Sequence, residues 1–181
     1  MTTAVLDHVR DLLPYFRERA EECEQGRMVP EASVKELSET GFFRLLQPRR
    51  YEGLEGDPLD FYEGIRLIAS ADASTGWISS VLGIHAWQLA LFPDTAQQAV
   101  WGSDTSTLAS SSYAPTGTAT LVDGGYQVSG RWSFSSGCEH ASWVLLGSLV
   151  TDDSGAMVDF KTFLLPRSDY TIEDAWDTIG L

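Results

Sequence analysis

Two short segments of the sequence combine hydroxyl side chains with aromatic rings. The first is Ser110-Ser111-Ser112-Tyr113, and the second, about twenty residues later, is Phe134-Ser135-Ser136. A flat heteroaromatic ligand needs both kinds of group, because its faces stack on apolar rings while hydroxyls bond its ring heteroatoms. The alternative is that the serines only form turns and the aromatic residues only fill the core of a sheet.

Two further residues are candidates for a ligand site. His85 lies in the most apolar stretch of the chain, where a neutral imidazole facing a pocket can accept a proton. The alternative is a core histidine bonded to a backbone carbonyl. Trp77 is suited either to stacking on a ring or to filling the core. We expect no metal site, because His8, His85 and His140 have no convincing metal-ligand spacing with one another or with cysteine and acidic residues.

The composition limits the class of protein. Hydrophobic content of 43% and charged content of 21% over 181 residues are typical of a globular protein. A net charge of -14 argues against nucleic acid or an anionic membrane surface as partner. Cys23 and Cys138 indicate two free thiols in a reducing cytoplasm, although the sequence alone leaves one disulfide open. No apolar run is long enough to cross a membrane.

The first half of the chain has the periodicity of helices, with apolar residues every three or four positions. We expect helices that begin near residues 1, 30, 57, 74 and 94. Pro14 either kinks the first helix or opens a second one. Asp57 is expected to cap the third helix, Ser74 or Thr75 the fourth, and Asp94 the fifth.

The second half has the composition and periodicity of strands. It is rich in Ser, Thr and Gly, and its apolar residues recur with a period near two. Strands are expected at residues 107–112, 119–122, 126–132, 143–150 and 161–165. A turn at Pro115 is expected to separate the first two, and Asp123-Gly124-Gly125 indicates a hairpin. Residues 124–143 are typical of a strand, a polar corner and a second strand.

Helices followed by strands predict an α+β fold. We expect an N-terminal helical domain at residues 1–103 and a small antiparallel β-barrel-like domain at residues 104–181. The sequence stops on apolar residues without a capping or polar tail, so we expect it to be the front part of a longer chain.

The order of these segments resembles the acyl-CoA dehydrogenase fold. The resemblance rests on Ser-Ser-Ser-Tyr-Ala-Pro at residues 110–115 and Gly-x-Trp-x-Phe-Ser-Ser-Gly at residues 130–137. Within this fold the chain is most similar to flavin-dependent aromatic monooxygenases that serve as oxygenase components of two-component systems. Supporting similarity lies at residues 42–48, 74–77, 83–87, 137–143 and 165–168. The C-terminal four-helix bundle of the family is absent from this sequence.

The resemblance implies a set of site residues and a reaction. Flavin contacts would come from Trp77, Ser111, Ser112, Tyr113, Phe134, Ser135 and Ser136. The catalytic residues would be Ser136, with its hydroxyl near the flavin N5, and His85, facing a phenol. The reaction would be ortho-hydroxylation of a phenolic substrate to a catechol, with O2 as co-substrate. The branch of the family that it most resembles acts on a secosteroid in bacterial cholesterol degradation.

The resemblance also implies partners. Reduced FMN would come from a separate NADH-dependent flavin reductase, and the protein would be a cytoplasmic homotetramer. A phenol titrates near 10 and a histidine near 6.5, so full proton transfer to His85 would be uphill by roughly 4 to 5 kcal/mol. Two alternatives stay open from the sequence. One is an acyl-CoA dehydrogenase-like oxidoreductase with bound FAD, and the other is a non-catalytic α+β interaction module.

Overall fold

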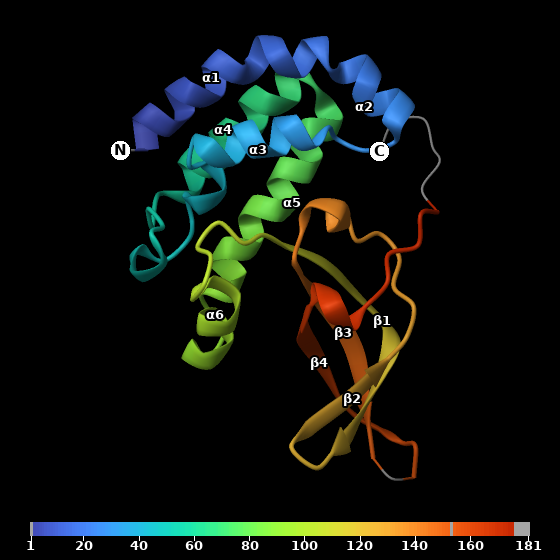
Figure 1. The fold of residues 1–181 in the computed structure, drawn as a ribbon. Helices are drawn as coiled ribbons and strands as arrows, with labels where there is room; N and C mark the ends of the chain where they lie inside the picture. The colour runs from blue at the N-terminus through green and yellow to red at the C-terminus, as the bar shows by residue number, and fades with distance from the viewer. Residues whose placement is uncertain (1, 153, 176–181) are drawn as a thin grey trace. The chain divides into compact units, whose positions relative to one another are not determined.

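A computed structural model describes residues 2–152 and 154–175 of the chain. It divides into two compact units (Figure 1). The helical unit contains the described residues up to Leu108 and those from Glu173 onward, and the β unit is Ala109–Ile172.

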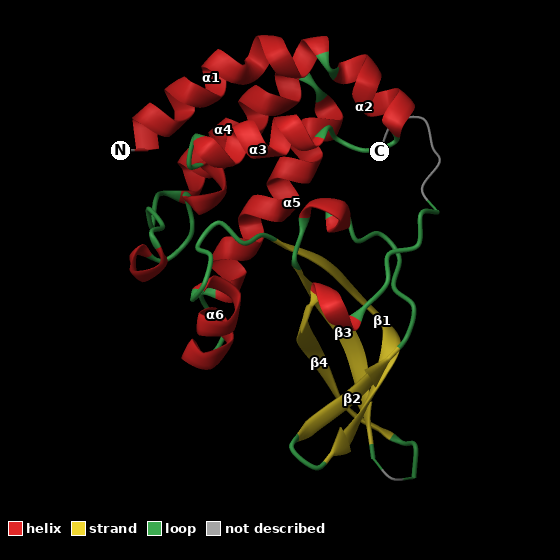
Figure 2. Ribbon diagram, viewed as in Figure 1, coloured by secondary structure: helices red, strands yellow, loops and turns green. Residues whose placement is uncertain are grey.

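The helical unit contains the helices that the periodicity predicts (Figure 2). Their bounds are α1 (Thr2–Glu18), α2 (Ala20–Gly26), α3 (Glu31–Glu39), α4 (Pro58–Ala71), α5 (Ala73–Leu89) and α6 (Asp94–Trp101). Short 3-10 turns follow α3, at η1 (Phe42–Arg44) and η2 (Arg49–Tyr51). The first expected helix is two helices, and the break falls at Arg19, whereas Pro14 lies inside α1.

An aromatic cluster forms the core of the helical unit. The rings of Phe42 and Phe61 are stacked with centroids 5.3 Å apart, and the ring of Phe43 meets Phe42 edge-on at 5.6 Å. Gly64 on α4 and Gly83 on α5 leave room for these rings, since a Cβ at either position would lie 2.4 Å and 2.5 Å, respectively, from a ring carbon. The two glycines therefore allow α4, α5 and η1 to pack closely.

The helix caps predicted from the sequence are confirmed only in part. Asp57 caps α4 as expected, and its side chain accepts from the backbone N–H of Leu59. The expectation of Ser74 or Thr75 as the cap of α5 was wrong. Asp72 is the cap, because its carboxylate accepts from the Thr75 N–H at 2.7 Å and so satisfies an unpaired donor of the first turn.

The start of α6 also differs from the expectation. Its capping position is Pro93, and no side-chain hydrogen bond caps the helix. Asp94 lies within the first turn, where its charge still favours the helix dipole.

The β unit is one four-stranded sheet in the order β2-β1-β3-β4. Its strands are β1 (Ala109–Val122), β2 (Gly125–Ser129), β3 (Trp143–Thr151) and β4 (Met157–Pro166). The outer pairs are antiparallel as expected, but β1 and β3 are parallel, so the sheet is mixed. The rings of Tyr126 on β2 and Phe163 on β4 lie 5.2 Å apart, so the sheet curls until its edge strands meet. Helices followed by a small curled sheet confirm the predicted fold class.

One detail of the strand prediction was wrong. The expected turn at Pro115 does not exist, because residues 109–122 form one strand whose register to β3 shifts between Ser112 and Gly117. A proline is tolerated there because the ladder is interrupted and its missing N–H is not needed. Residues 124–143 form a strand, an irregular segment and the start of a second strand as expected, and β2 and β3 lie on opposite sides of β1. The turn between β1 and β2 is confirmed, with Gly124 at a φ of +82°.

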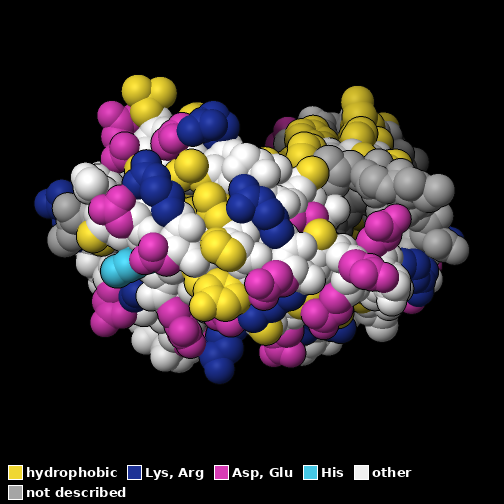
Figure 3. Space-filling view, turned by 90° about the horizontal axis from the view of Figure 1, so that it is seen from above, with side chains coloured by type: hydrophobic (Ala, Val, Ile, Leu, Met, Phe, Trp, Pro, Cys, Tyr) yellow, Lys and Arg dark blue, Asp and Glu magenta, His cyan; other side chains and the backbone are white. Residues whose placement is uncertain are grey.

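Figure 3 shows acidic and basic side chains interspersed on one face of the molecule. In the part of the chain that the structure describes, no helix combines the length and apolar character needed to cross a membrane. Most of the apolar ending noted in the sequence, residues 176–181, lies outside the described residues.

Candidate functional site

The β unit brings the two serine-bearing segments together. The Ser112 hydroxyl on β1 donates to the Ser133 carbonyl at 2.7 Å, and the Ser135 hydroxyl donates to the Ser110 hydroxyl at 3.2 Å. Ser110 and Ser112 are buried, and Ser135 is half-buried. Two hydrogen bonds therefore join segments that are about twenty residues apart in the sequence.

Aromatic rings lie exposed on the same two segments. The side chain of Phe134 is 76% exposed, and that of Tyr113 is 41% exposed. Phe134 has a φ of +61°, a left-handed conformation that costs a bulky residue about 1–3 kcal/mol. A strained backbone that displays an apolar ring beside hydroxyl groups suits the face and rim of a heteroaromatic ligand.

Residues 130–142 have little regular structure, and contacts with the sheet hold them in place. The indole N–H of Trp132 donates to the Gly147 carbonyl on β3 at 2.7 Å, and the Thr116 hydroxyl donates to the Arg131 carbonyl at 2.9 Å. Gly117 admits the indole, because a Cβ there would lie 2.0 Å from a Trp132 ring carbon. Trp132 is therefore an anchor of the segment, a role that the sequence did not single out.

The remaining predicted contacts on the β unit are half-buried. Ser111 lies in the β1–β3 ladder opposite Leu145, and Ser136 precedes Gly137, which has a φ of +77°. The Cys138 N–H donates to the Ser135 carbonyl at 3.1 Å and closes this turn. Both hydroxyls thus belong to the structure that carries Tyr113 and Phe134.

His85 is a buried histidine of α5, with 3% of its surface exposed. Its Nδ1 lies 3.3 Å from the amide oxygen of Gln88. An amide oxygen only accepts, so Nδ1 carries the hydrogen of this bond and Nε2 keeps the lone pair. Burial lowers the pKa of His85 to about 4, against a smaller opposing effect of the Gln88 bond. At neutral pH the ring is therefore uncharged and accepts hydrogen bonds at Nε2.

Gln88, which bonds the candidate residue His85, is a residue that sequence reasoning missed. Its spacing of three positions from His85 on one helix was the available signal, since residues three apart are neighbours on a helix surface. Trp77, on the same helix, is 47% exposed, so within the helical unit it is not a core residue.

The two cysteines are poor nucleophiles, because the pKa of each thiol is raised. Both are free, as the sequence predicted. Burial raises the pKa of Cys23 to about 11, and burial together with the neighbouring Glu139 carboxylate raises the pKa of Cys138 to about 12. Within residues 2–152 and 154–175, no group of three or more histidine, cysteine and acidic side chains is arranged to hold a metal ion.

The chain is similar to known proteins in sequence and fold. Residues 2–107 match the family model "Acyl-CoA dehydrogenase, N-terminal domain". The chain is 56% identical over 170 residues to the flavin-dependent monooxygenase, oxygenase subunit HsaA, of Rhodococcus jostii (strain RHA1). This match covers 94% of the chain and 44% of that protein. The chain thus spans less than half the length of this relative.

Solved structures are also similar. The HsaA monooxygenase from M. tuberculosis superposes with a TM-score of 0.96 at 51% identity, over 99% of this chain and 49% of that one. XiaF from Streptomyces sp., in complex with FADH2 and glycerol, superposes with a TM-score of 0.94 at 28% identity. That match covers 99% of this chain and 45% of XiaF.

Proposed function

Because this chain belongs to the acyl-CoA dehydrogenase family through its N-terminal domain, we propose that it serves in a flavin-dependent aromatic monooxygenase. The proposed enzyme is the oxygenase component of a two-component system, which hydroxylates a phenol ortho to its hydroxyl and yields a catechol. Similarity to an oxygenase subunit of such a monooxygenase supports this reaction over the dehydrogenation of a thioester. A secosteroid is proposed as the phenolic substrate, as the family resemblance of the sequence implies.

The observation that carries the proposal is the junction of the two serine segments in the β unit. Hydrogen bonds from Ser112 and Ser135 join these segments, and Tyr113 and Phe134 expose their rings beside them. Apolar ring faces next to neutral hydroxyls fit the faces and heteroatoms of an isoalloxazine ring. The proposed flavin contacts are Trp77, Ser111, Ser112, Tyr113, Phe134, Ser135 and Ser136.

A reduced flavin, when bound, supplies the two electrons that activate O2 for transfer of one oxygen atom to a substrate. The protein's contribution is to hold and surround the reactants. Ser136 is proposed to act through its hydroxyl, as a hydrogen-bond partner of the flavin. The rings of Tyr113, Phe134 and Trp77 are proposed to exclude water from the reaction.

His85 is proposed to accept a hydrogen bond from the phenol hydroxyl at Nε2. The phenol titrates near 10 and the pKa of His85 is about 4, so full transfer of the proton to the ring is uphill by about 8 kcal/mol. This is more than the roughly 4 to 5 kcal/mol that an ordinary histidine predicts. His85 therefore polarises the phenol and orients it, and it gains at most a partial share of the proton.

The proposal extends to partners and location. Reduced FMN is proposed to come from a separate NADH-dependent flavin reductase, as the resemblance to two-component systems implies. The protein is proposed to act as a homotetramer in the cytoplasm. Two free thiols agree with a reducing compartment.

The proposal is tested by binding and by product formation. Anaerobic titration with reduced FMN, oxidised FMN and oxidised FAD should show that the reduced FMN binds most tightly. Mixing the reduced complex with 18O2 and a phenol should give a catechol that carries one labelled oxygen atom. Tight binding of oxidised FAD without hydroxylation would point to a dehydrogenase, and failure to bind any flavin would point to an interaction module.

The residue assignments need their own variants. Phe134→Ala removes an exposed ring and should weaken binding of reduced FMN by about 1–3 kcal/mol, because stacking is lost without a cavity in the core. Leu121→Ala is the matched control, because Leu121 is an apolar residue of β1 outside the proposed site and is 66% exposed. Equal affinities for flavin in the two variants would remove Phe134 from the site.

A further inference from the structure

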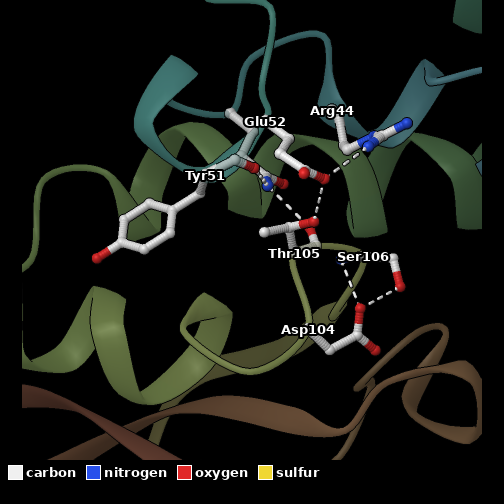
Figure 4. Close-up of polar contacts among 7 residues, drawn as sticks. Arg44, Tyr51, Glu52, Asp104, Thr105 and Ser106 are labelled. Atoms are coloured by element: carbon white, nitrogen blue, oxygen red, sulfur yellow. Dashed lines mark hydrogen bonds and ion pairs between the residues drawn. The ribbon is translucent and has the colours of Figure 1, made fainter.

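The link from helix α6 to strand β1 is seven residues long and has no helix or strand of its own. It consists of residues 102–108, all within the helical unit. A second irregular segment of the same unit, the loop of residues 44–56, lies against it. Figure 4 shows the Glu52 carboxylate of this loop between Arg44 and Thr105 of the link, whereas the ring of Tyr51 points away from the link and Asp104 bonds Ser106 within it.

Gln47 connects the loop to the link through its side-chain amide. The amide nitrogen donates to the Thr105 carbonyl at 2.8 Å and to the Tyr51 carbonyl at 2.6 Å. A primary amide has two N–H groups, so both are used. The side chain is 3% exposed, so water has little access to replace either bond.

Other side chains hold the link at neighbouring points. The Thr105 hydroxyl donates to a Glu52 carboxylate oxygen at 2.7 Å, and that carboxylate lies 3.5 Å from the Arg44 guanidinium. The buried indole of Trp101 donates to the Thr107 carbonyl at 3.2 Å. Two carbonyls of the link are thus bound by buried side chains, and one hydroxyl is bound by the loop.

The loop itself is closely packed around Gln47. A Cβ at Gly53 would lie 1.9 Å from the Gln47 carbonyl oxygen, which accepts from the Glu55 N–H at 3.1 Å. The ring of Tyr51 packs on Trp101 with centroids 5.4 Å apart. The amide of Gln47 is therefore held by surroundings that leave little room for another conformation.

We propose that Gln47 is a positioning residue for the flavin site, and this rests on the proposed function. It fixes Thr105, only a few residues before Ser110, and so limits the conformations open to the start of β1. That strand begins with the serines and the tyrosine assigned to the flavin. Ordering the link before a ligand arrives removes a conformational cost that binding would otherwise carry.

The decisive variant is Gln47→Met, which keeps the length and apolar stem of the side chain and removes both donors. Hydrogen–deuterium exchange should then be faster at the amides of residues 105–113, by about tenfold, since the Thr105 carbonyl loses its side-chain donor. Affinity for reduced FMN should fall about tenfold. Once flavin is saturating, the rate of hydroxylation should return toward that of the parent protein.

Glu55→Ala is the matched control for a second variant, Glu52→Ala, which removes the acceptor of the Thr105 hydroxyl. Both residues lie in the loop with positive φ, but Glu55 bonds Arg49 of its own loop and Glu52 bonds the link. Glu52→Ala should raise exchange at residues 105–108 and Glu55→Ala should not. This pair keeps the proposal testable even if Gln47→Met fails to fold.

Three results test whether Gln47 holds the link and positions the flavin site. Unchanged exchange at residues 105–113 in Gln47→Met would overturn the proposed tie to the link. Faster exchange with unchanged affinity for flavin would overturn the positioning role. If the parent protein binds no flavin, the proposed function fails, and a positioning role for a flavin fails with it, while the exchange data still report whether Gln47 restrains the link.

Discussion

Replacing the buried histidine of α5 tests the electrostatics of the helical unit. In the folded chain the pKa of His85 is about 4, below its ordinary value of 6.5, because burial disfavours the imidazolium. Between these two values the unfolded chain binds a proton that the folded chain does not. Stability is therefore fully present above pH 6.5 and is lost as the pH falls toward 4. The loss due to His85 between about pH 7.5 and about pH 4.5 is about 2.5 kcal/mol.

The variant is His85→Asn, whose amide nitrogen takes the place of Nδ1 and still donates to Gln88. Urea unfolding followed by circular dichroism at both pH values gives the free energy of unfolding for each protein. The parent should lose about 2.5 kcal/mol more than the variant over this range. The exposed His8→Asn variant should behave as the parent does. Parallel losses in the parent and His85→Asn would refute the assigned burial of an uncharged ring.

Three further predictions concern packing, hydrogen bonding and reactivity. Gly64→Ala should cost about 1–3 kcal/mol of folding free energy, because its Cβ would lie 2.4 Å from a ring carbon, whereas Gly26→Ala meets nothing within 4 Å and should change little in thermal unfolding. Trp132→Phe should cost about 1–3 kcal/mol in urea unfolding, because the Gly147 carbonyl loses its donor. With a pKa of about 12, Cys138 should react with iodoacetamide at pH 8 more than about a hundredfold slower than free cysteine, and a similar rate would contradict its burial.

Local signals in the sequence were sufficient for much of the fold. Asp57 followed by Pro58 marked the start of α4, and Asp123-Gly124 marked the turn between β1 and β2. Both rest on the geometry of one or two residues, which a sequence displays directly. The cap of α5 was harder to predict, because Asp72, Ser74 and Thr75 lie close together and each is able to cap a helix.

Features that depend on distant partners were not predictable. Pro115 was expected to end a strand, because nothing local reveals that the ladder to β3 is interrupted at that point. The parallel pairing of β1 with β3 is likewise set by packing across the sheet. Phe134 has a left-handed backbone that its side chain disfavours, so its exposure at the junction of the serine segments is visible only in the structure.

The residues proposed to meet the substrate and the flavin ring share one electrostatic property, which is that none is charged at neutral pH. The β unit offers hydroxyls and aromatic rings, and the helical unit offers His85, uncharged because its pKa is about 4. A phenol, which titrates near 10, arrives uncharged, and a protein with a net charge of -14 does not attract its anion. In the proposed reaction, charge would then develop on the phenol oxygen only as its hydrogen bond to Nε2 shortens. A neutral acceptor bonded to Gln88 is proposed to stabilise that change more in the transition state than in the ground state, which is the condition for catalysis.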